Sequence, residues 1–328
     1  MKSDTSVPLV TVVLTVFKRT RYLAEAISSV LRQTLPSLEL IVTDDGDTEA
    51  ARLICAKFQT DARLRYRSNP HALGVPLNIA KALFEARGKY LAILNDDDLI
   101  EPDMLKRLVT SLECDPSLVL AFGNYKVIDH EGRDMPNLTH ELMRLRSREK
   151  LLSGKVDQPF DFALRHGLMV GMGCIFRRTA CDVNWLVPEV AGAYDYWLTV
   201  NLARTGGGFY FVSETLMAWR QHEDSESARV SPEKPAPEVF IYESLSRLDL
   251  PNEAQRFVKN QLANYLNSLG CHRLLHEGKP SAARHAILQS LRIRPRPSGL
   301  VYFAISFFPA NRRLFVMNLW LRFRRKLG

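Results

Sequence analysis

Residues 9–46 read LVTVVLTVFKRTRYLAEAISSVLRQTLPSLELIVTDDG. Two β-branched apolar runs, Leu9–Val16 and Leu38–Thr43, flank the segment Arg21–Gln33, in which apolar residues recur at helical spacing. A strand, a helix and a second strand in this order are typical of a parallel sheet. The opening of the chain therefore predicts an α/β fold.

The same alternation continues well beyond this stretch. We expect further strands at Leu64–Arg67, Tyr90–Leu94, Val119–Tyr125, Gly173–Arg177 and Tyr210–Val212, and further helices at Thr48–Phe58, Pro76–Arg87, Met104–Leu112 and Tyr194–Arg204. After the proline-rich, charged stretch Arg229–Pro237 only helical patterns follow, at Phe240–Leu248, Asn252–Leu275 and Ser281–Leu291. We predict a domain of residues 1–228, a helical appendage of residues 229–293 and a basic tail of residues 294–328.

The composition excludes several classes of protein. With 328 residues, 46% of them hydrophobic and 24% charged, the chain has the proportions of a folded globular protein and not of a disordered one. Its five cysteines are spread out without a C-x-x-C pair, which favours a reducing cytosol over a disulfide framework or a zinc site. We expect neither a secretory signal nor a membrane-spanning helix, because no apolar run is long enough.

Carboxylates follow two of the expected strands. Asp44 and Asp45 come after one apolar run, and Asp96, Asp97 and Asp98 come after another. Ligands of open α/β sheets bind beyond the carboxyl ends of the strands. A single Asp there can also be a turn former or a helix cap, and for Asp44 and Asp45 the residues leave this open. Three adjacent carboxylates repel one another unless a cation intervenes, so Mg²⁺ or Mn²⁺ completed by substrate phosphates is the natural ligand; the alternative is a solvated acidic turn.

The order and spacing of these segments resemble the inverting family 2 glycosyltransferases of GT-A fold. The matching stretches are Val12–Thr34, Leu38–Glu49, Ala72–Val75, Ala86–Leu105, Tyr194–Gly207 and Ala218–Ser227. The resemblance implies a Rossmann-like, mostly parallel central sheet flanked by helices. It also implies transfer of a sugar from a nucleoside-diphosphate donor, a UDP-sugar in the first place, to a hydroxyl of a glycan or lipid-linked acceptor, with Mn²⁺ or Mg²⁺ as cofactor.

The resemblance also assigns roles on the donor side. Carried over to this chain, Thr15, Phe17 and Asp45 line the pocket of the nucleotide base, and Asp45 accepts a hydrogen bond from the base edge. Asp97 is then the metal ligand, and Asp96 contacts the ribose or a metal-bound water.

Three later residues complete the implied site. Asp195 matches the general base of inverting members. Arg220 and His222 match an R-x-H motif whose arginine can clamp phosphate and whose histidine can approach the diphosphate or the metal. Without the resemblance, structural roles are equally open. Asp195 could be an acid that the helix dipole favours in the first turn of a helix, and a lone histidine such as His222 is more often structural.

The chain departs from the family pattern at five positions. Phe17 stands where tyrosine is frequent, and Asn95 replaces the first acid of the D-x-D signature. Tyr194 and Trp197 replace acids near the expected base, and Asn201 replaces a frequent arginine. The last four of these changes support a second hypothesis from another class, a catalytically silent sugar-nucleotide-binding or scaffold protein that keeps the fold. Phe17 by itself can also be a core aromatic.

The basic end of the chain suggests a partner. Nine lysines and arginines and no acid lie between Arg292 and Gly328, so the rest of the chain is close to neutral despite the net charge of +8. Leu300–Leu327 alternates apolar blocks with arginines, which favours contact with an anionic membrane surface at the cytoplasmic face. The alternative is a helix packed on its own domain, and no nucleic-acid-binding module is recognisable.

Two further questions remain at this point. A third hypothesis is nucleotidyl transfer, which would require a basic, glycine-rich phosphate-binding loop near the N-terminus. The segment Lys18–Arg21 is basic but contains no glycine, which disfavours this hypothesis. We expect the segment Asp129–Met169 to shape acceptor binding. Self-association through the helical appendage is left open by the sequence.

Overall fold

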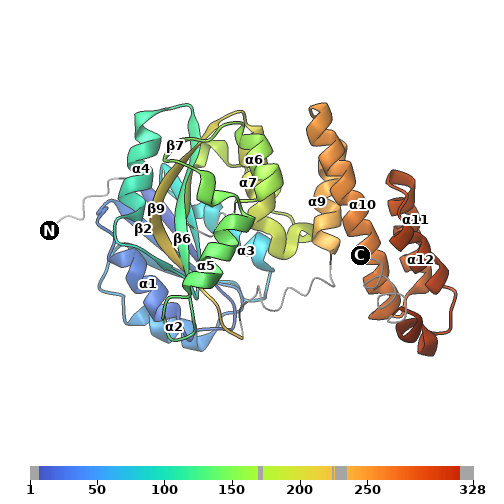
Figure 1. Ribbon diagram of the computed structural model, residues 1–328. Coiled ribbons are helices and arrows are strands. Elements are labelled where there is room, and N and C mark those ends of the chain that lie inside the picture. Colours follow the sequence, from blue (N-terminus) through green and yellow to red (C-terminus); the bar gives the residue numbers. More distant parts are fainter. Residues whose placement is uncertain (1–6, 169–172, 224, 226–234, 318–328) are drawn as a thin grey trace. The chain divides into compact units, whose positions relative to one another are not determined.

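The computed structural model describes residues 7–168, 173–223, 225 and 235–317. The chain divides into two compact units, Met1–Ala228 and Arg229–Gly328, and each is described by itself (Figure 1). Most of the stretch Arg229–Pro237, where the sequence predicts a boundary, lies outside the described residues.

The first unit is built around one twisted sheet (Figure 1). Its strands are β1 (Val10–Val16), β2 (Leu38–Asp44), β3 (Leu64–Ser68), β4 (Tyr90–Asn95), β5 (Leu99–Ile100), β6 (Leu118–Ile128), β7 (Gly154–Lys155), β8 (Cys174–Arg177) and β9 (Gly208–Arg220). They lie in the order β3-β2-β1-β4-β8-β6-β9-β5, and β7 pairs with β9. Most paired residues belong to the parallel pairs β1–β2, β1–β4, β2–β3 and β6–β9. The predicted α/β fold with a mostly parallel sheet is confirmed.

Helices cover both faces of this sheet. They are α1 (Leu23–Leu31), α2 (Glu49–Ala56), α3 (Val75–Glu85), α4 (Met104–Cys114), α5 (Pro136–Leu145), α6 (Pro159–His166) and α7 (Tyr194–Arg204), with short 3-10 turns at Arg148–Lys150, Arg178–Ala180, Val183–Trp185 and Pro188–Ala193. The alternation of side chains along β1 sends Val12 and Leu14 to the face that α1, α2 and α4 cover. Val13 points to the other face, where Figure 1 shows α3, α6 and α7.

The register of the parallel strands aligns the residues that matter for function. Thr15 of β1 lies opposite Thr43 of β2 on one side and Asn95 of β4 on the other. The chain therefore leaves three neighbouring strands at one edge of the sheet. As a result, the segment after β1, the acids after β2 and the acids after β4 emerge side by side.

Two differences from the predicted elements have physical reasons. β9 runs over thirteen residues, far past the predicted Tyr210–Val212, because register shifts opposite Gly123 and Asn124 carry the pairing across an exposed polar stretch. The helices α5 and α6 were not predicted, since they are short, ten and eight residues, and few of their side chains are buried.

The second unit is helical. It contains α9 (Ala236–Ser246), α10 (Asn252–Leu275), α11 (Pro280–Ile293) and α12 (Pro297–Ile305), followed by helical residues 310–317. Ile305 and Met317, from the predicted tail, are buried in one cluster with Leu274 and Ala283. The described part of the tail is therefore packed on its own unit through one face, and residues 318–328 lie outside the described residues. Within the described residues, no helix combines the length and the apolar character that crossing a bilayer requires.

Candidate active site

The segment after β1 presents an exposed aromatic ring. Phe17 keeps 42% of its surface accessible, so it is not a core aromatic. Gly46 lies beside it, since a Cβ at that glycine would approach the ring edge to 3.9 Å. The ammonium of Lys18 lies 4.9 Å from the ring centroid. Thr15, two residues earlier, is half-buried at the end of the same strand. An aromatic face is thus available at the edge of the sheet, next to the acids that follow β2.

The two acids after β2 differ in what they bind. Asp44 accepts hydrogen bonds from the backbone N–H of Thr48 at 2.6 Å and from the hydroxyl of Tyr66 at 2.9 Å, as a structural turn acid does. Asp45 instead contacts residues far along the chain. Its Oδ1 accepts from Leu73 N at 2.8 Å and its Oδ2 from Gly74 N at 2.8 Å. The turn-former alternative thus describes Asp44 and not Asp45.

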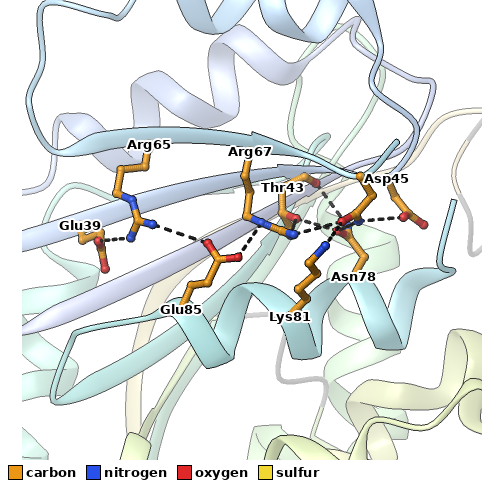
Figure 2. A network of polar contacts seen from close by, with 9 residues as sticks. Glu39, Thr43, Asp45, Arg65, Arg67, Asn78, Lys81 and Glu85 are labelled. Carbon is orange, nitrogen blue, oxygen red and sulfur yellow. Dashed lines mark hydrogen bonds and ion pairs between the residues drawn. The ribbon is translucent and has the colours of Figure 1, made fainter. Parts of the chain in front are cut away.

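A polar network stands behind Asp45 (Figure 2). Its members are Thr43, Asn69 and Asn78 in the interior, with Arg67, Lys81 and Glu85 around them and Glu39 and Arg65 at the far end. The amide of Asn69 donates to Asp45 Oδ1 at 3.1 Å. None of these contacts is visible in the local sequence pattern.

The three acids after β4 are buried, and two of them, Asp96 and Asp97, share a cationic partner. Arg19 reaches Asp96 at 2.9 Å and Asp97 at 3.3 Å, and His222 Nε2 lies 3.0 Å from Asp97 Oδ2. Burial raises the pKa of Asp96, as does the negative charge of Asp97, while Arg19 opposes both. Burial also raises the pKa of Asp98. The solvated acidic turn is therefore not what the chain forms here, because these carboxylates are held away from water, Asp96 and Asp97 against cations and Asp98 by the amide of Asn95 and a backbone N–H.

Arg220 holds the acidic turn in place through hydrogen bonds to Asp97 and Asp98. It is 2% exposed, and its Nε donates to the backbone carbonyl of Asp97 at 3.0 Å while its Nη2 donates to Glu25 at 2.8 Å. Its guanidinium lies 4.2 Å above the ring centroid of Tyr22. Its backbone N–H donates to Asp98 at 3.0 Å. These contacts use the arginine inside the protein and fix the acidic turn.

Asp195 lies in the first turn of α7. Its Oδ1 accepts from the backbone N–H of Tyr196 at 2.7 Å, and burial raises its pKa to about 6. Burial raises the pKa of Tyr194, and the charges of Asp195, Asp98 and Asp97 raise it further. Asp97 and Asp195, predicted as metal ligand and base, are therefore both within electrostatic reach of one phenol.

The donor set fits a divalent ion that is completed by a substrate. Asp97 Oδ2 and His222 Nε2 converge to 3.0 Å, one carboxylate and one imidazole. Across residues 7–168, 173–223, 225 and 235–317, no three or more His, Cys, Asp and Glu side chains gather into a metal cage. Mg²⁺ characteristically takes one or two carboxylates and leaves its other positions to phosphates and water. Asp97 and His222 suit that arrangement.

The sequence pattern does not reveal several residues of this region. Arg19 stands out in the sequence only for its charge, and no motif marks Asn69. Backbone strain marks the region as well, because Lys18, Asp47 and Ala191 have positive φ values of 60°, 50° and 38°. Such residues tend to cluster at functional sites, and each of these lies within four residues of a predicted site residue.

Comparison with known proteins agrees with this architecture. The family model described as Glycosyl transferase family 2 matches residues 11–183. An uncharacterized glycosyltransferase of Rickettsia typhi is 27% identical over 225 residues, which cover 68% of this chain and 67% of that protein. Chondroitin synthase of Escherichia coli is 30% identical over 274 residues, 79% of this chain but 37% of the synthase. The putative teichuronic acid biosynthesis glycosyltransferase TuaG of Bacillus subtilis is 25% identical over 258 residues, 77% of this chain and 94% of TuaG.

Solved structures show the same fold. TarS of S. aureus, residues 1–349 in complex with UDP-GlcNAc, superposes with a TM-score of 0.65 at 16% identity, over 92% of this chain and 90% of that one. The mannosyltransferase PcManGT from Pyrobaculum calidifontis, in complex with GDP-Man and Mn²⁺, gives 0.55 at 14% identity, over 95% and 86%. Since the family model matches more than half of its length, the chain belongs to glycosyl transferase family 2 and is a glycosyltransferase.

Proposed function

We propose that this glycosyltransferase is metal-dependent and inverting, and that it moves a sugar from a nucleoside-diphosphate donor, a UDP-sugar in the first place, to a hydroxyl of a glycan or lipid-linked acceptor. One observation carries the proposal: at the carboxyl edge of the sheet of a family 2 glycosyltransferase, the buried Asp97 lies 3.0 Å from His222, and Asp195 stands in the first turn of α7 with its pKa raised to about 6 by burial. A cation held by Asp97 and His222 would bind the donor's diphosphate, and Asp195 would accept the proton of the acceptor's hydroxyl. The relatives named for chondroitin and teichuronic acid synthesis support a polysaccharide product.

On the donor side, the base stacks on the exposed ring of Phe17 and donates to Asp45 in this proposal, with Thr15 beside them. Asp96 faces the ribose or a metal-bound water. Neighbouring structures that hold UDP-GlcNAc and UDP support a uridine nucleotide.

Asp97 and His222 hold Mn²⁺ or Mg²⁺ in this proposal, and PcManGT with Mn²⁺ is a supporting neighbour. Such an ion neutralises the charge that builds on a departing diphosphate. Arg220 has a different role from the phosphate clamp that the resemblance implied. Because its guanidinium is buried on the carbonyl of Asp97 and on Glu25, we assign it to positioning the metal ligand.

On the acceptor side, Asp195 takes the proton of the attacking hydroxyl. The attack comes from the face opposite the leaving diphosphate, so the anomeric configuration inverts. Residues 129–168, the described part of the segment Asp129–Met169, border this side, since the positive charge of Arg146 acts on Asp195 and a Cβ at Gly167 would lie 3.4 Å from the ring of Tyr196; Met169 lies outside the described residues. We propose that this segment, predicted from sequence to shape acceptor binding, selects the acceptor.

The helical unit and tail are proposed to attach the enzyme to the cytoplasmic face of a membrane. Phe307 and Phe315 are 66% and 71% exposed, and Arg312 and Arg313 lie between them in sequence. Sedimentation with anionic vesicles tests this: replacing both phenylalanines by serine should reduce binding several-fold, and vesicles of neutral lipid should bind weakly. Equal binding by the variant would contradict the membrane role.

The decisive experiment for the function combines binding and turnover. UDP and UDP-sugars with Mn²⁺ should raise the melting temperature and Asp97→Asn should abolish the metal-dependent part of that shift, while Mn²⁺-dependent hydrolysis of the sugar nucleotide should be measurable. The matched control is Asp134→Asn, an exposed acid that pairs with Lys126. Binding without any turnover would favour the catalytically silent alternative. Absence of binding for every nucleoside diphosphate would contradict the proposal.

A further inference from the structure

Asn69 is completely buried, and every hydrogen-bonding position of its amide is used. Its Oδ1 accepts from Arg67 at 3.0 Å and from Lys81 at 3.2 Å. Its Nδ2 donates to Asp45 at 3.1 Å and to Asn78 at 2.8 Å. Two cations thus hold the amide oxygen, so the amide cannot turn over, and its N–H group must point at Asp45.

The surroundings of Asn69 are fixed as tightly as the amide. Its backbone N–H donates to the carbonyl of Asp44 at 2.9 Å. Asn78, which receives its second N–H, is itself held by Thr43, whose hydroxyl donates to Asn78 Oδ1 at 2.6 Å. Arg67 is anchored further by Glu85 at 3.2 Å. The position of the Asn69 donor is therefore set by three separate elements: β2, β3 and α3.

The consequence for Asp45 follows from counting acceptor sites. A carboxylate has about four lone-pair positions. Asp45 Oδ1 uses two of them, for Asn69 and for the backbone N–H of Leu73, and Oδ2 uses one for the backbone N–H of Gly74. One position, on Oδ2, is left for a ligand. A carboxylate with one acceptor left matches a base that offers one N–H on its pairing edge, as uracil does, and not guanine, which offers two neighbouring donors.

We propose that Asn69 is a positioning residue that sets the base specificity of the donor site, by filling the second lone pair of Asp45 Oδ1 and leaving a single acceptor for uracil. This inference rests on the proposed role of Asp45. It extends that role to a residue that does not touch the donor.

The test is the isosteric substitution Asn69→Asp, measured by titration calorimetry with UDP and GDP in the presence of Mn²⁺. The new side chain still accepts from Arg67 and Lys81, but at pH 7.5 it turns a carboxylate oxygen towards Asp45 in place of an N–H. We expect the Kd for UDP to rise at least about tenfold relative to the wild type. Lowering the pH should bring the Kd of the variant closer to that of the wild type, because the introduced carboxyl, once protonated, can donate to Asp45 again. A merely structural asparagine gives no such rescue by protons.

Two further variants make the result unambiguous. Asn69→Ala removes the donor without adding charge, so UDP binding should weaken and the preference for UDP over GDP should shrink. Arg65→Gln is the matched control, because Arg65 lies on the same strand and pairs with Glu39 and Glu85 without contacting Asn69. It should leave the Kd for UDP within about twofold.

The outcomes separate the two proposals. If the wild-type protein binds UDP and the substitution Asp45→Asn abolishes this binding, the proposed donor site is supported. Unchanged UDP affinity in Asn69→Asp then overturns the role of Asn69 alone. If the wild type does not bind UDP, the proposed donor is contradicted and this inference with it. Loss of the cooperative thermal transition in both Asn69 variants would show that the residue is purely structural, which also overturns the inference.

Discussion

The ionisation of Asp195 gives the sharpest test of the proposed mechanism. Burial raises its pKa to about 6, against the opposing effects of the Tyr196 N–H and the positive charge of Arg146. A general base works as the carboxylate, so activity should be present above this pKa and should be lost as the pH falls through it. About 90% of the side chain is ionised at pH 7 and about 10% at pH 5. The rate should therefore fall about ninefold between these values.

Mutation of the same residue sets the scale of its contribution. Asp195→Asn keeps the shape of the side chain but cannot accept the proton, and loss of a general base typically costs about 10²- to 10⁴-fold in rate. The assay is the initial rate of transfer or donor hydrolysis at saturating UDP-sugar and Mn²⁺, with UDP affinity measured in parallel. The affinity should stay within about threefold, because Asp195 is assigned to the acceptor side.

Controls come from the neighbourhood of the base. Asp161→Asn removes an exposed acid that pairs with Arg165 on α6, and it should leave the rate unchanged. Arg146→Met removes a charge that lowers the pKa of Asp195, so the acid limb of the pH profile should move to higher pH. A profile that stays flat down to pH 5, or an Asp195→Asn enzyme with more than a tenth of the wild-type rate, would refute Asp195 as the base.

Two other predictions concern the cation site and the core. Arg19→Ala should raise the affinity for Mn²⁺ alone, by several-fold in a paramagnetic binding assay, because the arginine now occupies Asp96 and Asp97 as a competing cation; a weaker affinity would count against competition. Gly207→Ala should lower the free energy of unfolding by about 1–3 kcal/mol in urea titrations, since its Cβ would come within 2.1 Å of Val119 Cγ1; wild-type stability would show that this contact yields easily.

The framework of the first unit could be predicted from local patterns. The strands β1, β2 and β4 begin and end within a residue of the apolar runs that predicted them, and α7 has the predicted bounds Tyr194–Arg204. These elements are buried, so their apolar periodicity carries the information directly. The acids after β2 and β4 were found for the same reason: once the strand ends are known, the carboxyl edge of the sheet follows.

What could not be predicted depends on contacts between distant segments. Arg19 and Asp96, which form an ion pair, are 77 residues apart in the sequence, and Arg220 and Glu25 are 195 residues apart. No periodicity or motif encodes such pairs. Arg220 illustrates this, because the motif match predicts a donor to phosphate, whereas its guanidinium donates to the carbonyl of Asp97 and to Glu25 in the structure.

The two acidic turns at the edge of the sheet are stabilised in opposite ways, and this difference fits them for different parts of one donor. Asp45 is surrounded by N–H donors that belong to fixed backbone and a locked amide, so its position cannot adjust when a ligand arrives. Fixed, neutral donors around Asp45 suit the recognition of a neutral nucleotide base in the proposed donor site. Asp96 and Asp97 are instead balanced by Arg19, whose side chain is 27% exposed and carries a full charge on a long, flexible stem. In the proposed donor complex, a side chain of that kind would leave when a divalent ion replaces its charge, and it would then be free to face the diphosphate, the part of the donor that needs a cation.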